Sequence, residues 1–123
     1  MAGVYPLEIE QGATFERPIT WYDGDPDVPP YGTPIDVTDY LARAQIRTTK
    51  DADDVLVDLT DWLTVGTEDG VVTLSIPAED TALMDWNGSA YWDLELESPG
   101  GQVTRLLEGR ATLSKEVTRE DSS

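Results

Sequence analysis

Apolar and polar residues alternate along most of this chain with a period of two. The clearest case is the run "YWDLELE", in which Trp92, Leu94 and Leu96 alternate with acidic residues. Such an alternation predicts a β-strand with one buried face and one face in water. Comparable runs cover much of the chain: residues 5–9, 15–22, 41–49, 55–60, 71–76, 90–97 and 103–117.

Short strands separated by turn residues are typical of an antiparallel β-sandwich. The turn "SPGGQ" predicts a hairpin between the last two runs, with a bulge at Gly109. Pro18 has no amide donor, so its strand is expected at a sheet edge or at a bulge. A short helical turn is predicted near 77–84, where Pro77 suits the first helical position. We therefore expect an all-β antiparallel sandwich of about seven strands, in a single domain spanning residues 1–123.

Charge alone predicts one strand pairing. If the strand at residues 90–97 is central in its sheet, its outward acids lie between the strands at 41–49 and 103–108. Pairs of opposite charge across strands contribute roughly 0.2–1 kcal/mol each, and exposure places them near the lower end. The expected ladder sets three arginines opposite three acids: Arg43, Arg47 and Arg105 opposite Asp93, Glu95 and Glu97.

The overall charge narrows the function classes. The chain has 25 acidic and 8 basic residues and a net charge of −17. Such a field repels phosphates, so nucleic acids and anionic membranes are not expected partners. The absence of cysteine and histidine removes thiolate nucleophiles, sulfur-ligated zinc and every Ser-His or Cys-His arrangement. We expect a protein that is not an enzyme and has no cofactor.

One stretch resembles the beginning of a calcium-binding loop. Asp23, Asp25 and Asp27 occupy the first, third and fifth positions of such a loop. Val28 stands where the loop needs glycine, and Pro34 stands where it needs a bidentate glutamate. The three aspartates remain a weak candidate for a metal site, and the sequence favours a turn between two strands.

Five aromatic residues divide into two groups. Trp21 and Trp92 fall on inward faces and are expected in the core. Tyr31, Trp62 and Trp86 fall in connecting segments and are the candidates for a protein interface. Residues of the same kind also close the ends of a sandwich, so both alternatives stay open for these three.

Four pieces of the sequence, taken in order, resemble a known family. They are "GAT" after Gln11, "PIDVT", "GVVTLSIP" and "YWDLEL", within a frame that spans about Ile9 to Arg119. Together they resemble a family of small tailed-phage and prophage proteins. They are similar, more distantly, to the N-terminal β-sandwich domain of phage baseplate upper proteins. The resemblance implies an immunoglobulin-like sandwich that serves as a building block of the virion.

The resemblance also sets the functional expectation. It implies a structural virion protein that attaches to other virion proteins, as an accessory or adaptor at the tail tip or baseplate. A capsid decoration protein is the alternative, and an acidic DNA-mimic inhibitor is an alternative of another class. The expected partners are tail-tip, baseplate or major capsid proteins, with this chain in several copies or as a homo-oligomer. The expected location is the virion, after synthesis in the host cytoplasm.

Overall fold

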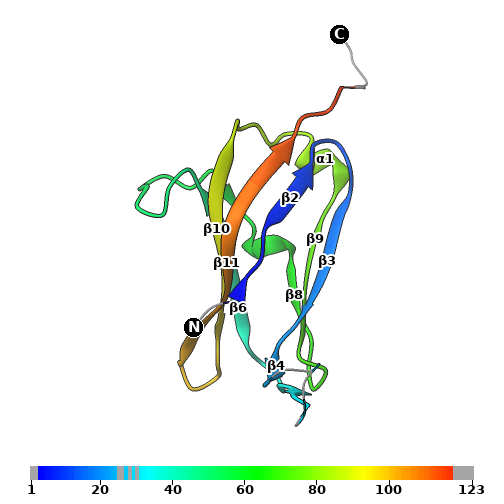
Figure 1. Cartoon of the computed structure of the whole chain (residues 1–123), viewed down its shortest axis with the longest axis vertical. Helices are drawn as coiled ribbons and strands as arrows, with labels where there is room; N and C mark the ends of the chain where they lie inside the picture. The colour runs from blue at the N-terminus through cyan, green and yellow to red at the C-terminus, as the bar shows by residue number, and fades with distance from the viewer. Residues whose placement is uncertain (1–2, 25–26, 28, 30, 118–123) are drawn as a thin grey trace.

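Two sheets face each other across the core (Figure 1). The structure is a computed structural model, which describes residues 3–24, 27, 29 and 31–117. In the larger sheet the strand order is β1-β11-β10-β6-β7, with β2 also paired to β11. Its strands are β1 (Gly3–Val4), β2 (Leu7–Glu10), β6 (Leu41–Arg47), β7 (Val57–Asp58), β10 (Ser89–Glu97) and β11 (Val103–Ser114).

The smaller sheet has the order β3-β9-β8. Its strands are β3 (Phe15–Thr20), β8 (Leu63–Val65) and β9 (Val71–Ile76). A separate two-stranded ribbon joins β4 (Tyr22–Asp23) to β5 (Thr33–Pro34). The two short helices are η1 (Thr60–Trp62), a 3₁₀ turn, and α1 (Ala78–Thr81).

The predicted all-β sandwich is confirmed. In the described part of the chain, seven strands have three or more residues, and the other four have only two. The helical turn expected near 77–84 is α1.

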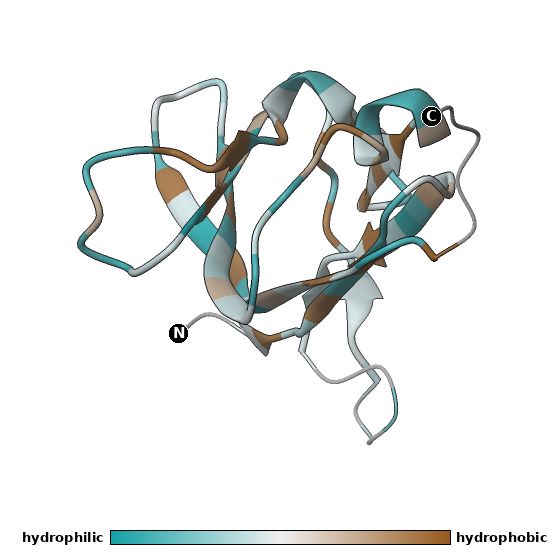
Figure 2. Ribbon diagram, turned by 90° about the horizontal axis from the view of Figure 1, so that it is seen from above, coloured by the Kyte–Doolittle hydropathy of each residue, from teal (hydrophilic) through white to brown (hydrophobic). Residues whose placement is uncertain are grey.

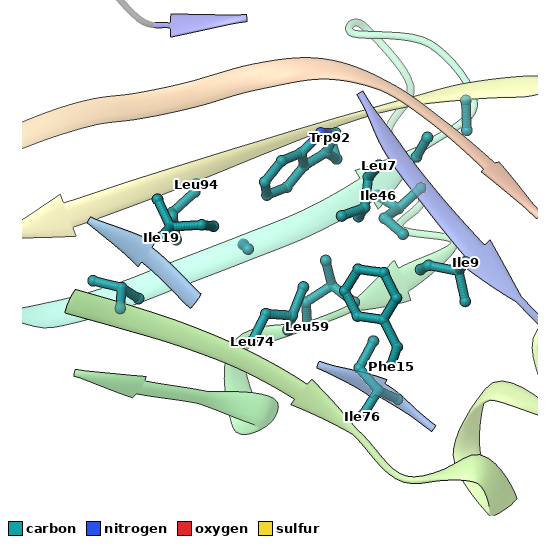
Figure 3. Close-up of a cluster of buried hydrophobic side chains, with 14 of the residues drawn as sticks. Leu7, Ile9, Phe15, Ile19, Ile46, Leu59, Leu74, Ile76, Trp92 and Leu94 are labelled. Carbon is teal, nitrogen blue, oxygen red and sulfur yellow. The ribbon is translucent and has the colours of Figure 1, made fainter. Parts of the chain in front are cut away.

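The core fills the space between the two sheets. Hydrophobic and hydrophilic positions follow one another along the strands (Figure 2), and the apolar ones face inward. Trp92 and Leu94 of β10 lie across from Leu74 of β9 (Figure 3). All three side chains are at most 3% exposed. Burial of this kind contributes roughly 1.5–3 kcal/mol for each large apolar side chain.

The N-terminal segment is attached to the centre of the larger sheet through Trp92. β1 and β2 both run parallel to β11, and Tyr5 lies between them. The indole N–H of Trp92 donates to the Tyr5 carbonyl at 2.8 Å, and the two rings meet edge to face at 6.3 Å. Gly109 on β11 completes this contact, because a Cβ atom there would lie 2.5 Å from the Tyr5 carbonyl oxygen.

The structure corrects the predicted bulge. Trp92 pairs with Gly109 in regular register, and the irregularity falls between Leu94 and Glu95. Leu94 pairs with Leu107 and Glu95 with Arg105, which leaves Leu106 as the extra residue of β11. The glycine is therefore needed for close approach to the N-terminal segment, and not for a bulge.

The prediction for Pro18 is confirmed. Its strand, β3, pairs with β9 alone among the described strands and so lies at an edge of the smaller sheet. An edge position tolerates the missing amide donor, because only one side of the strand is paired.

Gly109→Ala is expected to destabilise the fold by about 1–3 kcal/mol, since its methyl group would press on the Tyr5 backbone. The matched control is Gly100→Ala in the β10–β11 turn, where the nearest atom to an added Cβ is 3.9 Å away. We expect the control to change the free energy of unfolding by less than about 0.5 kcal/mol. Urea unfolding measures both values. Equal effects of the two substitutions would contradict this account of Gly109.

Candidate binding face on the larger sheet

The outer face of the larger sheet is hollowed into a groove of about 340 Å³. By outer face we mean the side turned away from the core, formed by the outward side chains of its strands. The volume of the groove is at the small end of the range for small-molecule sites. Acidic, basic and aromatic side chains line it: Arg43, Gln45, Arg47, Lys50, Tyr91, Asp93, Glu95, Arg105 and Glu108, with Ala44 and Trp92.

The strand registers place three acids in one line across this face. Asp58 of β7 pairs with Gln45 of β6, Gln45 with Asp93 of β10, and Asp93 with Glu108 of β11. We call Asp58, Asp93 and Glu108 the acidic row. Outward side chains repeat every second residue along a strand, so neighbouring rows are about 7 Å apart.

The next line across the sheet is basic. Tyr91 of β10 pairs with Arg47 on one side and with Arg110 on the other. Lys50, in the loop after β6, places its ammonium nitrogen 5.9 Å from the centre of the Tyr91 ring, and the guanidinium carbon of Arg110 lies 5.4 Å from it. Cations at these distances are attracted to the face of an aromatic ring. We call Arg47, Lys50 and Arg110 the basic row.

On the other side of the acidic row, Arg43 and Arg105 flank Glu95. Nη2 of Arg43 lies 3.4 Å from Glu95, and Nη1 lies 3.4 Å from Glu97. This part of the predicted charge ladder is confirmed, with β10 between β6 and β11 as expected.

The acidic row is also paired, at longer distances. Arg105 lies 3.6 Å from both Asp93 and Glu108, and Lys50 lies 3.9 Å from Glu108. Strong N–H···O bonds span roughly 2.7–3.2 Å, so these pairs are longer than strong hydrogen bonds. The groups are partly exposed, and each pair contributes little to stability.

Arg47 departs from the predicted ladder. Its guanidinium donates to the carbonyls of Ala52 and Asp53, at 2.6 and 3.0 Å, and to the Gln45 side chain at 2.9 Å. The reason is the register, which sets Arg47 opposite Tyr91 and beside the loop that follows β6. Arg47 therefore anchors this loop next to the groove, and the expected ion pair with an acid of β10 was wrong.

Asp93 is the acid whose environment is most unfavourable for charge. Partial burial, and then repulsion from Glu95, raise the pKa of Asp93, while Arg105 acts in the opposite direction. Asp58, at the edge of the same row, differs: the backbone N–H of Thr60 donates to it at 2.9 Å and lowers its pKa. The acidic row thus holds one carboxylate with a raised pKa and one with a lowered pKa.

The metal candidate gains no further ligands. Asp23 is exposed in β4, Asp27 is exposed, and Asp25 lies outside the described residues. Within the residues that the structure describes, no group of three or more acidic side chains is arranged to hold a metal ion. Likewise, no described helix has the length and apolar character to cross a membrane.

The three interface candidates do not lie together. Tyr31 is 65% exposed, between β4 and β5. Trp62 is half-buried in η1 and packs against the core. Trp86 is only 7% exposed, and its indole N–H points to the Ala111 carbonyl at 3.4 Å. Trp86 is therefore a core residue with little surface for a partner, and Tyr31 alone of the three is mainly in solvent.

No protein-family model matches this chain, and no curated protein matches it. The chemistry of the groove is therefore inferred from the residues that line it. Sequence reasoning missed it, although one signal was present: five of the chain's eight basic residues come from strands or loops that meet on this face.

Trp86→Ala is expected to lower the free energy of unfolding by about 3–5 kcal/mol, because it empties a buried site. Tyr31→Ala is the contrasting variant and is expected to stay within about 0.5 kcal/mol of the wild type. Chemical denaturation followed by fluorescence measures both. A mild effect of Trp86→Ala would mean that this side chain is not part of the core.

Asp93→Asn is expected to raise stability at pH 7. A raised pKa means that the charged carboxylate opposes folding above that pKa, and that wild-type stability rises as the pH falls toward the ordinary value of 3.8. The gain from the substitution should therefore disappear below about pH 3.8. Asp58→Ala is the opposite control: its lowered pKa means that the charge stabilises the fold above 3.8, so the variant should lose stability at pH 7. Urea unfolding from pH 3 to 7 tests both signs.

Proposed function

We propose that this chain is a non-enzymatic structural protein of a tailed-virus particle, which attaches to other virion proteins. The observation that supports a binding role is the outer face of the larger sheet. Rows of opposite charge stand there on paired strands, around a shallow groove. Fixed rows of charge recognise a complementary surface without a large ordering cost, because the sheet already holds them in place.

The pairing of the groove's charges favours binding over catalysis. Asp93, whose pKa is raised, and Glu95 lie two residues apart on one strand, and two such carboxylates could in principle act as an acid and base pair. Each of them faces an arginine, at 3.6 and 3.4 Å respectively. Such pairs neutralise charge across a contact surface and set its specificity.

The virion assignment itself comes from the four-part sequence resemblance. The same resemblance favours the tail tip or baseplate, with capsid decoration as the alternative. The rival class, a DNA-mimic inhibitor, needs a face of uninterrupted acids spaced like phosphates. The outer face has arginines between its acids, and this supports the structural role over the mimic.

Mass spectrometry of purified particles is the deciding experiment. We expect the chain to be present in clean particles of the virus that encodes it, at a fixed ratio to the major capsid protein. A small copy number supports the tail tip or baseplate, and a copy number near that of the capsid protein supports decoration. Absence from clean particles would overturn the proposal and favour the DNA-mimic inhibitor instead.

A further inference from the structure

We infer that a second copy of this chain docks on the outer face of the larger sheet, with the acidic row of each copy against the basic row of the other. The inference rests on the proposed function only in taking the same face as a contact surface. It goes beyond that function by naming the occupant and the geometry.

Net charge restricts where two copies can meet. Each chain carries −17, so contact between acidic surfaces is repulsive almost everywhere. Five basic residues gather on the outer face: Arg43, Arg47, Lys50, Arg105 and Arg110. The others do not form a second basic surface: Arg17 lies over the Phe15 ring, Lys115 bonds Asp85, and Arg119 is outside the described residues. The outer face is thus the part of the described surface where an acid-rich partner meets cations.

The sign of the charge alternates from row to row along the strands. Among the described residues, strand register gives the basic row Arg47 and Arg110, and Lys50 joins it from the loop after β6. The acidic row holds no cation of its own, and its ion pairs come from Arg105 and Lys50 of the neighbouring rows. Because adjacent rows differ in sign and are about 7 Å apart, the face is complementary to a copy of itself that is displaced by one row.

A two-fold axis produces this displacement. An axis across the strands at the level of Trp92 lies midway between Asp93 and Tyr91, and therefore between the acidic and basic rows. Rotation about it brings Glu108 of one copy over Arg110 of the other, and the reciprocal contact forms by symmetry. Such an isologous arrangement is the commonest form of homodimer.

The neighbouring rows also agree with this axis. The row with Arg43, Glu95 and Arg105 would then face the row that contains Ser89, Thr112 and Glu8. Two arginines and one glutamate on one side oppose a single glutamate on the other. The net charges of these two rows are opposite, so the flanking contacts add to the attraction between the copies.

The size of the face indicates a reversible dimer. The nine residues of β10 extend over about 30 Å, and five strand positions span about 20 Å. The resulting area of about 600 Å² is somewhat below the roughly 800 Å² per partner of a standard interface. We therefore expect a monomer–dimer equilibrium that depends on protein concentration.

The length of the ion pairs within one copy is also relevant to docking. The pairs that involve the acidic row are 3.6 to 3.9 Å long, and charge-assisted bonds to a partner are typically shorter, at roughly 2.7–2.9 Å. Partial burial on docking would strengthen these contacts relative to their value in water.

Paired charge reversals test the geometry on the purified chain. One variant reverses the basic row, Lys50→Glu with Arg110→Glu. The other reverses the acidic row, Asp93→Lys with Glu108→Lys. Sedimentation velocity at about 150 mM salt, where repulsion beyond roughly 8 Å is screened, gives the oligomeric state. We expect the wild type to dimerise as its concentration rises, each variant alone to remain monomeric, and an equimolar mixture of the two to form a 1:1 dimer.

A control separates row pairing from overall charge. Glu16→Lys with Glu68→Lys makes the same change in net charge as the acidic-row variant, at exposed positions on β3 and in the β8–β9 loop. Mixed with the basic-row variant, it should not form the 1:1 dimer. Circular dichroism checks folding, and the single changes Arg110→Glu and Glu108→Lys replace any double variant that fails to fold.

Three results would overturn the inference. They are a wild type that stays monomeric up to about 1 mM, variants that dimerise alone as well as the wild type does, and a control mixture that pairs as well as the reversed rows. A monomeric wild type that is nevertheless found in virus particles would leave the proposed function standing. A chain that dimerises in solution but is absent from particles would leave the inference standing and overturn the proposed function.

Discussion

Because β10 lies between β6 and β11, its residues from Tyr91 to Glu97 have a paired neighbour on both sides, and their alternation constrains both faces of the larger sheet. The inward residues Trp92, Leu94 and Leu96 are at most 3% exposed and form the middle of the core. The outward residues between them can only be polar, and here they are mostly acids. A slip of one residue would bury these acids and expose the tryptophan, so the register is strongly fixed.

Because the core fixes the register of the strands, it also fixes where their side chains lie on the solvent side. The charged rows exist because the core holds β6, β10 and β11 at one mutual alignment. The extra residue at Leu106 shifts the alignment of β11 by one position, and Arg105 thereby lies opposite Glu95. A packing irregularity of the sheet thus decides which arginine meets which acid on its surface.

The N-terminal segment is held by the same strand. The indole N–H of Trp92 donates to the Tyr5 carbonyl, and Gly109 allows the backbone of β11 to approach that of Tyr5. One side chain therefore serves the core and also fixes the strands β1 and β2 against β11. Surfaces on rigid sheets lose little conformational entropy when they meet a partner.

The sequence by itself determined the class of the fold, because alternation with period two needs no knowledge of distant contacts. It also predicted the charge ladder that the strand at 90–97 makes if it is central, and the structure places β10 between β6 and β11. Only the tertiary structure decided the contacts that the local pattern does not specify: the approach of Gly109 to Tyr5, the burial of Trp86, and the turn of Arg47 toward the carbonyls of its own loop. The groove belongs to the same group. It combines β6 with β10, which lie more than forty residues apart, and the register that aligns them depends on how the core packs, which local pattern does not specify.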